Sequence, residues 1–579
     1  MNRVFIWRAH LLRSTVVCLL LINAIAGSIA QAATDDLYDR TWRDLRFGLF
    51  IHWGLYSMLA GEWDGQPVTV GYSEQIQAWA KIPQEQYAQL AKQFNPTRFD
   101  PDAIVDLARN AGMRYIVLTS KHHDGFSMFH TAQSKYNVVD ATPYGKDVLL
   151  ELATACRRKG MKLGVYYSLI DWAEGHDPQP DHNSNPIGSH IEQLSVKQLE
   201  ELMSNYGEIV ELWFDMGSPT PEQSKLYADT VHRLQPACRV SGRVWNNQGD
   251  FIVMGDNRIP DYKIADPWQT PASIYRETWG YRRWKKRDDL DGKIRELTRN
   301  LVSVVSRGGV YLLNIGPRGD GSIVAFEVDV LNGIGQWVKR HRTAVFDTRP
   351  NPFDHLDWGE ATTSDSTLYC FIYDWPENDR LRVPGLLNRA TGIRLLSNPA
   401  ERLDPPRRDG HDLIIDLAGL SPDPILTVIA IDYQDELRIR PQRIVYPGEN
   451  DIVMIGAEDC IHSHSRAGGN YFQQKTSTTR ETAYLEVVRS GAYRVQIEGE
   501  ITSPTARMTI EIDDQHVVFR LPTEMGTADF RLEPSVTFHL QAGQLHKLTL
   551  RRDQPDYPQQ DIGIQLKTVT LVPLDHSGQ

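Results

Sequence analysis

The chain has 579 residues, of which 41% are hydrophobic and 23% are charged, and its formal net charge is −12. A chain of this length and apolar content can form two or three hydrophobic cores, which excludes a disordered or fibrous protein. The excess of acidic residues argues against nucleic acid as a partner, because binding to phosphates requires basic surfaces.

Residues 1–32 have the pattern of a secretory signal peptide. Three arginines precede an apolar run from Val16 to Ala26, and Ala30-Gln31-Ala32 matches a small-x-small cleavage site. The apolar run is short for a bilayer span, and no later run is long enough. The mature chain is therefore expected to be periplasmic or secreted, without a membrane anchor, and loss of the three arginines makes its net charge −15. A retained N-terminal anchor is the alternative.

Four cysteines remain after cleavage, namely Cys156, Cys238, Cys370 and Cys460. An oxidising compartment permits disulfides between them, and spacing alone leaves three pairings open. The chain contains neither a CxxC nor an HExxH motif. The sequence therefore indicates no structural or catalytic zinc site.

Strands and helices alternate between residues 47 and 342. Short runs rich in β-branched and aromatic residues predict buried strands at 47–53, 113–119, 162–167, 208–214, 239–243 and 310–315. Apolar residues at three-to-four spacing predict helices between them, at 83–94, 102–110, 147–158, 191–206, 221–234 and 292–306. Repeated βα units without a glycine-rich phosphate loop after the first strand favour a TIM-like (β/α) barrel. An open doubly wound sheet is the alternative.

Two β-sandwiches are predicted to follow this barrel. Short alternating strands such as 367–373 and 412–416 come after a proline-rich break, and a second break at 438–448 precedes further strands. The predicted organisation is a signal peptide at 1–32, a catalytic barrel at 33–349, a small β-sandwich at 350–437 and an additional β-sandwich at 438–579.

The last sandwich has a functional and a structural interpretation. Its aromatic residues Tyr471, Phe472 and Tyr557 could stack on sugar rings. The sandwich would then bind carbohydrate and raise the effective concentration of substrate near the barrel. Equally, it could only pack against the barrel or another subunit.

Asp215 stands where the apolar strand 208–214 ends, just before Met216-Gly217. Catalytic groups of (β/α) barrels lie at the C-terminal ends of the strands. The sequence therefore predicts that Asp215 is a catalytic nucleophile. The alternative is that Asp215 caps the helix predicted at 221–234.

Other polar and aromatic side chains stand at successive strand ends. His52-Trp53-Gly54 ends the first strand, and Lys121-His-His-Asp-Gly-Phe126 follows the second. Consecutive strand residues point to opposite faces, so His122 and His123 are not expected to bind one metal ion. Aromatic rings and neutral imidazoles around a carboxylate form a wall that packs on the apolar face of a sugar and hydrogen-bonds its hydroxyls.

Seven motifs stand in order along the chain, namely Arg46-Phe-Gly-Leu-Phe-Ile-His-Trp-Gly54, Tyr72-Ser-Glu74 with Ile82-Pro83, Lys121-His-His-Asp-Gly-Phe126, Gly164-Val-Tyr-Tyr-Ser168, Trp213-Phe-Asp-Met-Gly217, Thr278-Trp-Gly-Tyr281 and Leu313-Asn-Ile-Gly-Pro317. Together they resemble the α-L-fucosidases of glycoside hydrolase family 29. The resemblance runs from about Asp36 through the first sandwich. It implies a retaining exo-glycosidase that releases terminal α-L-fucose from a fucosylated glycan through a covalent intermediate, with no metal or organic cofactor.

The resemblance also implies roles for individual residues. Asp215 aligns with the nucleophile, and Asp256 is the position favoured for the general acid/base, with Glu277 as its rival. From composition alone, Asp256 would be a turn residue in Gly-Asp-Asn. Sugar contacts are implied for His52, Glu74, His122, His123, Tyr166, Trp213 and Arg243.

One departure from the family pattern concerns the position after Trp268. Many members carry Trp-Glu where this chain has Trp268-Gln269, and glutamine cannot supply a proton. The departure removes one candidate acid and puts a substrate contact in doubt. Two other functions stay open, a retaining glycosidase of different sugar specificity and a non-catalytic sugar-binding barrel, as does assembly into a homo-oligomer.

Overall fold

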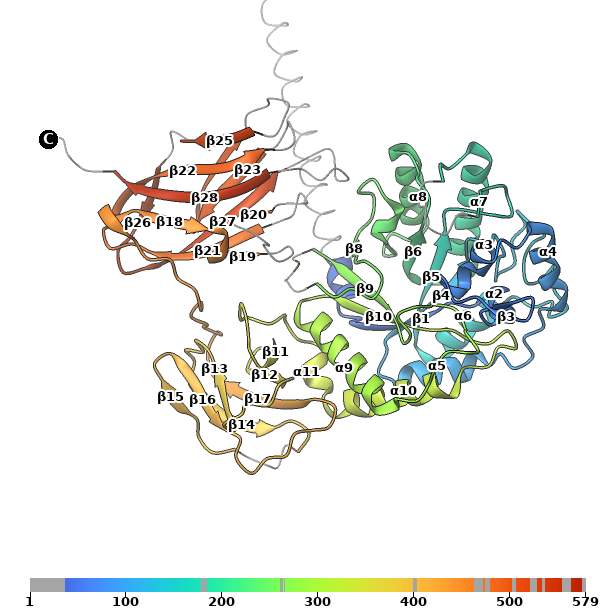
Figure 1. Ribbon diagram of the computed structural model, residues 1–579, viewed down its shortest axis with the longest axis horizontal. Helices are drawn as coiled ribbons and strands as arrows, with labels where there is room; N and C mark the ends of the chain where they lie inside the picture. The colour runs from blue at the N-terminus through green and yellow to red at the C-terminus, as the bar shows by residue number, and fades with distance from the viewer. Residues whose placement is uncertain are drawn as a thin grey trace, which may run out of the picture.

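The computed structural model describes residues 37–178, 185–260, 264, 266–398, 403–462, 472–473, 480–501, 507–520, 528–533, 537–553 and 564–574. The predicted signal peptide, Tyr471 and Tyr557 lie outside these residues. Across the described ranges, every helix is too short or too polar to cross a bilayer. Figure 1 shows three parts in chain order, an α/β part in blue to green, a β-sandwich in yellow and a second in orange to red.

Eight parallel strands form the sheet of the first part. Their order is β7 (Arg239–Val240), β6 (Ile209–Asp215), β5 (Lys162–Ser168), β4 (Tyr115–Lys121), β1 (Phe47–Ile51), β10 (Val310–Ile315), β9 (Trp268–Ser273) and β8 (Ile252–Val253). The two edge strands meet where Ser241 bridges Phe251, and the bond from the Gly242 N–H to the Phe251 carbonyl measures 2.8 Å. The sheet therefore curls into the predicted (β/α) barrel.

Helices cover the outside of this sheet (Figure 1). The longer ones are α5 (Pro101–Asn110), α6 (Val148–Lys159), α7 (Ser189–Asn205), α8 (Pro221–Leu234), α9 (Leu290–Ser306) and α10 (Ala325–Arg340). An aspartate caps three of them, because the side chains of Asp100, Asp147 and Asp289 each accept a bond from a first-turn N–H. All residues of β1 and β4 are buried, as parallel strands covered on both faces require.

The barrel part also contains shorter helices and strands. They are α2 (Tyr56–Leu59), β2 (Glu62–Trp63), β3 (Gln66–Pro67), η1 (Ser73–Gln75), α3 (Ile76–Trp79), α4 (Gln84–Ala88), η2 (Gln89–Gln93), η3 (Gly242–Val244) and α11 (Arg342–Val345). The helix predicted at 83–94 is thus divided between α4 and η2, and the strand predicted at 239–243 stops at Val240.

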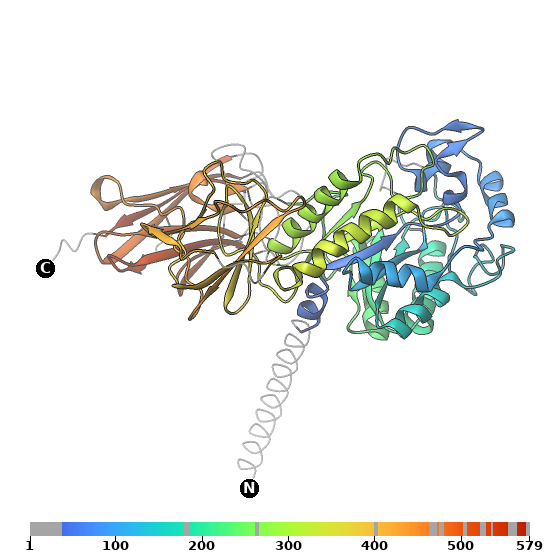
Figure 2. The same cartoon turned by 90° about the horizontal axis from the view of Figure 1, so that it is seen from below.

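The first sandwich has a four-stranded and a three-stranded sheet. The strands are β11 (Gly359–Thr363), β12 (Thr367–Ile372), β17 (Thr427–Tyr433) and β14 (Ala390–Leu395), then β13 (Arg380–Val383), β16 (Asp412–Asp416) and β15 (Arg407–Asp409). Leu368 and Cys370 of β12 face the core between these sheets, whereas Tyr369 and Phe371 pack into the barrel core. Figure 2 shows the barrel helices α9 and α10, in yellow-green, on the side facing this sandwich.

The second sandwich has a hydrophobic core of its own. One sheet contains β18 (Val453–Gly456), β20 (Phe472–Gln473), β22 (Gly491–Ile501), β25 (Ala528–Leu532), β26 (Thr537–Leu540) and β28 (Ile564–Pro573). The other contains β19 (Ile461–His462), β21 (Arg480–Glu486), β23 (Arg507–Ile512), β24 (Gln515–Arg520) and β27 (Leu545–Asp553). The exact boundaries proposed between the three parts stay predictions.

The four cysteines that follow the predicted signal peptide are buried free thiols, so none of the disulfide pairings that were left open is formed.

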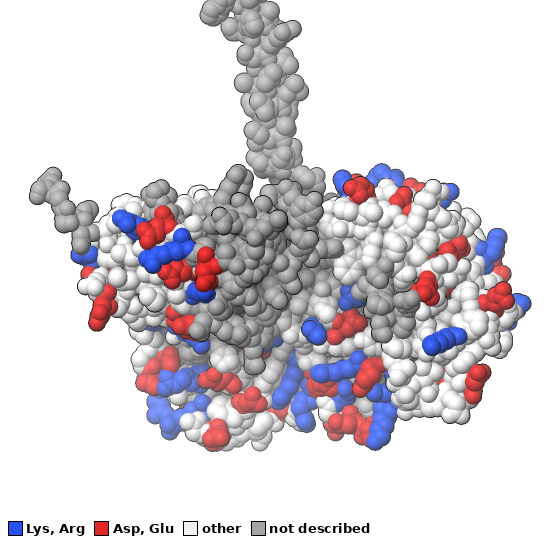
Figure 3. Space-filling view, turned by 45° about the horizontal axis from the view of Figure 1, so that its top comes forward, with Lys and Arg blue, Asp and Glu red and all other residues white. Residues whose placement is uncertain are grey.

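On the face drawn in Figure 3, acidic and basic side chains are intermixed over the barrel and the sandwiches.

Candidate active site

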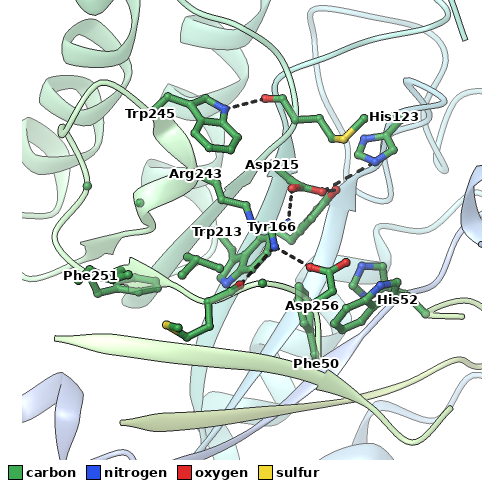
Figure 4. Close-up of a pocket in the computed structure, with 18 of the residues that line it drawn as sticks. Phe50, His52, His123, Tyr166, Trp213, Asp215, Arg243, Trp245, Phe251 and Asp256 are labelled. Carbon is green, nitrogen blue, oxygen red and sulfur yellow. Dashed lines mark hydrogen bonds and ion pairs between the residues drawn. The ribbon is translucent and has the colours of Figure 1, made fainter. Parts of the chain in front are cut away.

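A cavity of about 1160 Å³ lies at the C-terminal ends of the barrel strands (Figure 4). Strand ends supply its wall, with Asp215 at the end of β6 and Arg243 just after β7. The structure brings all nine residues singled out in the sequence to this cavity, namely His52, Glu74, His122, His123, Tyr166, Trp213, Asp215, Arg243 and Asp256.

The carboxylate of Asp215 is held by three side chains. The Tyr166 hydroxyl donates to Oδ2 at 2.8 Å, Arg243 Nη1 donates to Oδ1 at 2.8 Å, and His123 Nε2 lies 3.8 Å from Oδ2. Burial alone would raise the pKa of Asp215, but the Arg243 charge, His123 and these hydrogen bonds outweigh it and lower the pKa. Asp215 is therefore ionised at neutral pH.

Asp215 does not cap the next helix. At the start of α8, the Thr220 side chain accepts a bond from the Gln223 N–H, and the Gln223 side chain accepts a bond from the Thr220 N–H. This capping box satisfies the helix end. The capping interpretation of Asp215 is thus wrong, and the carboxylate points into the cavity.

Arg243 joins two carboxylates. Its Nη1 contacts Asp215 and its Nη2 donates to Asp256 Oδ1 at 2.6 Å, while the guanidinium lies 4.9 Å from the centre of the Trp213 ring. Burial lowers the pKa of Arg243, but the two carboxylates more than compensate and raise it. One rigid cationic fork therefore fixes both acids at the cavity.

Glu277, the rival acid, lies elsewhere. Its side chain is 62% exposed, it accepts a bond from Lys285 Nζ at 2.6 Å, and it does not line the cavity. Asp256 lines the cavity with a side chain 26% exposed. The loop that carries it is attached to β9, because the Ser273 N–H donates to Asn257 Oδ1 at 2.7 Å.

The cavity histidines are neutral. His52 Nδ1 is 2.7 Å from Asn314 Oδ1, and His123 Nδ1 is 2.8 Å from Ser168 Oγ. Burial lowers the pKa of His52 to about 3 and that of His123 to about 4. His122 is also buried, with a lowered pKa and no hydrogen-bond partner for Nδ1 within the described residues.

The expectation that His122 and His123 point to opposite sides is wrong. Their ring centres lie 3.9 Å apart, and both residues line the cavity. The cause is that β4 ends at Lys121, so strand alternation no longer governs the two residues that follow.

Glu74 is bound to the loop that carries Trp279. Its Oε2 accepts the N–H groups of Trp279 at 3.1 Å and Gly280 at 2.9 Å. Burial, opposed by these bonds, raises the pKa of Glu74 to about 7. The carboxyl group therefore positions one wall of the cavity and also reaches its interior.

Gln269 lies behind the cavity wall and not in it. Its Oε1 accepts the Trp213 indole N–H at 2.7 Å, and its Nε2 lies 2.9 Å from Glu211 Oε2 and 3.0 Å from the Tyr115 hydroxyl. The glutamine is fully buried. At this position the chain therefore uses an amide to orient Trp213, which stacks on Tyr166 and lies 4.9 Å from the Arg243 guanidinium.

Glu211 makes the stability of the barrel depend on pH. Burial raises its pKa to about 7, and the partners Gln269 and Trp42 only partly oppose this shift. The ordinary pKa of a glutamate, 4.5, applies in the unfolded chain, so between that pH and about 7 the folded state holds more protons. Stability is then lost as pH rises through this window, to which Glu74 and Asp124 contribute with the same sign.

We expect the barrel Tm to fall between pH 5 and pH 7.5, and Glu211→Gln to reduce that fall by roughly 5 °C. The glutamine keeps the shape of the side chain and cannot ionise. Thermal unfolding followed at several pH values measures the difference. Glu208→Gln, at a site 72% exposed directly before β6, is the matched control and should leave the slope unchanged. Equal slopes for Glu211→Gln and wild type would contradict the assignment.

Trp245 is a cavity residue that the sequence did not reveal. It has φ 66° and ψ −178°, a region essentially restricted to glycine, at a cost on the order of 1–3 kcal/mol. Asn246 and Asn247 follow with φ of 52° and 55°. The Asn-Asn pair signals a turn, since asparagine tolerates positive φ, but it says nothing about the tryptophan.

Comparisons with known proteins agree with this site. The family model described as Alpha-L-fucosidase matches residues 26–343, more than half of the chain. The tissue alpha-L-fucosidase of Homo sapiens is 29% identical over 419 residues, which cover 65% of this chain and 87% of that protein. The plasma alpha-L-fucosidase of Homo sapiens is 28% identical over 400 residues, covering 62% and 84%.

Solved structures extend the similarity. The alpha-L-fucosidase from Vibrio sp. strain EJY3 is 28% identical with a TM-score of 0.63, over 92% of this chain and 97% of that one. A GH29 alpha-L-fucosidase from Bacteroides thetaiotaomicron, trapped as a covalent intermediate with 2-fluoro-fucosyl fluoride, is 26% identical with a TM-score of 0.61, over 68% and 95%. With the matched family model and the cavity at the strand ends, these likenesses establish that the chain belongs to the alpha-L-fucosidase family of glycoside hydrolases.

Proposed function

We propose that this protein is a retaining exo-glycosidase that hydrolyses terminal α-L-fucose from oligosaccharides, polysaccharides or glycoconjugates by double displacement. The observation that carries the proposal is the arrangement of Asp215 and Asp256 about one guanidinium in the cavity. Retaining glycosidases need two carboxyl groups close together, typically about 5–5.5 Å apart. The relative trapped as a covalent intermediate supports the same stereochemistry.

In the first step, Asp215 attacks the anomeric carbon and forms a glycosyl ester while the bond to the leaving oxygen breaks. Asp215 suits this role because it is ionised and fixed by Tyr166 and Arg243. Asp256 gives its proton to the departing oxygen. We assign that proton to Oδ2, because Oδ1 contacts Arg243.

In the second step, Asp256 acts as the base. It takes a proton from a water molecule, whose oxygen attacks the anomeric carbon and releases Asp215. Two inversions at one carbon leave the product with the configuration of the substrate. Tyr166 and Arg243 then again stabilise the carboxylate of Asp215.

The remaining cavity residues bind the sugar. Neutral imidazoles can donate and accept hydrogen bonds, and His52, His122 and His123 all line the cavity. Phe50 and Trp213, with ring centres 5.3 Å apart, offer apolar surface. Apolar surface suits the C6 methyl group of fucose better than a hydroxymethyl group. From the predicted signal peptide, we also infer a periplasmic or secreted location.

The test compares two aryl glycosides that differ by one hydroxyl group. We expect nitrophenol release from 4-nitrophenyl α-L-fucoside and far slower release from 4-nitrophenyl α-L-galactoside. 2-Deoxy-2-fluoro-fucosyl fluoride should add one fluorofucosyl group to the peptide that contains Asp215, detected by mass spectrometry. Preference for the galactoside would indicate another glycosidase. Sugar binding with no turnover of any glycoside would indicate a non-catalytic barrel.

A further inference from the structure

We infer that the cavity accepts only fucose whose hydroxyl groups are free, because two of its histidines are fixed as hydrogen-bond acceptors and its arginine is already bound by two carboxylates. The inference rests on the proposed function and names its substrate class, which is fucose without sulfate or other ester groups. His52 and His123 carry the first part of the argument, and Arg243 carries the second.

The tautomer of His52 follows from its contacts with Asn314. Asn314 Nδ2 donates to the Trp279 carbonyl at 2.8 Å, which fixes the orientation of the amide. Asn314 Oδ1 accepts the backbone N–H of His52 at 3.2 Å and lies 2.7 Å from Nδ1 of the His52 ring. An amide oxygen can only accept hydrogen bonds, so Nδ1 carries the proton. In the neutral ring, Nε2 therefore holds a lone pair.

The tautomer of His123 follows in the same way from Ser168. Ser168 Oγ donates to the Ile170 carbonyl at 3.0 Å, which leaves only its lone pairs for His123 Nδ1 at 2.8 Å. His123 Nδ1 is therefore the donor, and Nε2 holds the lone pair. This Nε2 is 3.8 Å from Asp215 Oδ2, beyond hydrogen-bond distance. Both atoms are acceptors, so a substrate group placed beside them must be a donor.

The two Nε2 atoms face the space that the sugar would fill. Neither makes a hydrogen bond to any residue that the structure describes, and neither is a fully buried atom without a partner. Both residues line the cavity, and burial keeps both rings neutral, with a pKa of about 3 for His52 and about 4 for His123. A free hydroxyl group can donate to such an atom, whereas a sulfate ester, a methyl ether or a fluorine cannot.

The charge of the cavity also disfavours an anionic sugar. Arg243 donates through Nη1 to Asp215 at 2.8 Å and through Nη2 to Asp256 at 2.6 Å, so both arms of its fork are occupied. A sulfate group would lose its hydration and meet lone pairs and carboxyl groups without a compensating cation. Within the described ranges, Arg243 is the only lysine or arginine of the lining, which has six carboxyl groups, those of Asp39, Glu74, Asp215, Asp250, Asp256 and Asp266.

The experiment measures kcat/KM of the full wild-type chain for 4-nitrophenyl α-L-fucoside and six derivatives. Three carry one sulfate ester, and three carry one fluorine in place of a hydroxyl group, at C2, C3 or C4. We expect each sulfate to lower kcat/KM by about 10³-fold or more, and fluorine at C3 or C4 to lower it by about 10²-fold. Fluorine is smaller than a hydroxyl group and cannot donate, so it separates a lost donor from a steric clash.

Hydrolysis of any sulfated fucoside within about tenfold of the parent compound would overturn the inference. It would also be overturned if fluorine at C3 and at C4 each cost less than about threefold, because the histidines would then not require a donor. Failure of wild type to hydrolyse 4-nitrophenyl α-L-fucoside itself would instead refute the proposed function.

A variant tests whether the tautomer of His123 is the cause. Ser168→Ala removes the acceptor of the Nδ1 proton, so the ring can adopt the other tautomer and donate from Nε2. For at least one fluorinated fucoside, kcat/KM relative to the parent compound should then rise about tenfold. This ratio cancels both the inductive effect of fluorine and any general loss of activity.

Ser306→Ala on α9 is the matched control. Ser306 is fully buried outside the cavity, and its hydroxyl also donates to a backbone carbonyl, that of Ser303 at 3.1 Å. The control should keep the wild-type ratios for all three fluorinated compounds. Wild-type ratios in Ser168→Ala as well would overturn the assignment of His123 as a fixed acceptor.

Discussion

Asp215→Ala is expected to lower kcat/KM for 4-nitrophenyl α-L-fucoside by about 10⁴-fold or more, since loss of a nucleophile removes the covalent route. Added azide should restore turnover, because the shorter side chain leaves room beneath the anomeric carbon. Attack by azide replaces only the first displacement. The product should therefore be β-L-fucosyl azide, with inverted configuration, which NMR identifies.

The control for this variant is Asp229→Ala on α8, where the side chain is 59% exposed and pairs with Lys225. It should match wild type with and without azide. A fucosyl azide of α configuration from Asp215→Ala would assign Asp215 to the acid/base step. Activity above about 1% of wild type without azide would show that Asp215 is not the nucleophile.

Asp256→Ala should slow hydrolysis in proportion to the basicity of the leaving group, by about 10²–10⁴-fold for a fucosyl disaccharide. A sugar alkoxide needs the proton of a general acid, whereas 2,4-dinitrophenolate leaves without one. Formation of the glycosyl ester from 2,4-dinitrophenyl fucoside should therefore stay near the wild-type rate. Rates for a series of aryl fucosides, plotted against the pKa of the phenol, measure the effect.

Azide again separates the roles, because an Asp256→Ala enzyme can still form the ester. Azide then attacks the ester and gives α-L-fucosyl azide with retained configuration. Glu277→Gln is the matched control, since Glu277 is exposed and paired with Lys285, and its plot should follow wild type. The opposite result would be a rate that falls steeply with the pKa of the leaving group in Glu277→Gln and as in wild type in Asp256→Ala. It would show that Asp256 is only a turn residue and not the general acid.

The apolar part of the barrel was predictable because its strands are buried on both faces. The strands predicted at 47–53, 162–167 and 310–315 correspond to β1, β5 and β10 within a few residues. β9 escaped prediction because its polar residues, including Gln269, are bonded inside the barrel, where hydrophobic periodicity gives no signal.

Helix α10 escaped prediction for a different reason. It contains glycines that argue against a helix in isolation. A Cβ on Gly335 would lie 2.0 Å from the Asn110 carbonyl oxygen at the end of α5. The glycine thus serves close packing between helices, a tertiary requirement that local sequence does not contain.

The site was predictable as a set of residues but not as a network. Strand-end position and the family motifs single out residues such as Asp215 and His52, which share the cavity. The joining of Asp215 and Asp256 by Arg243, and the orientation of Trp213 by Gln269, depend on contacts between distant segments. Trp245 stayed hidden as a cavity residue because nothing in the local sequence predicts its positive-φ backbone conformation.

The alternation of β12 between two cores makes the barrel and the first sandwich one cooperative folding unit. Tyr369 and Phe371 complete the barrel core, and the Trp337 indole of α10 donates to the Leu426 carbonyl of the sandwich at 2.9 Å. A fragment cut near residue 349 would expose the apolar surface of α10 to solvent and favour aggregation. The second sandwich, with a separate core, can be lost or exchanged in evolution without unfolding the catalytic unit.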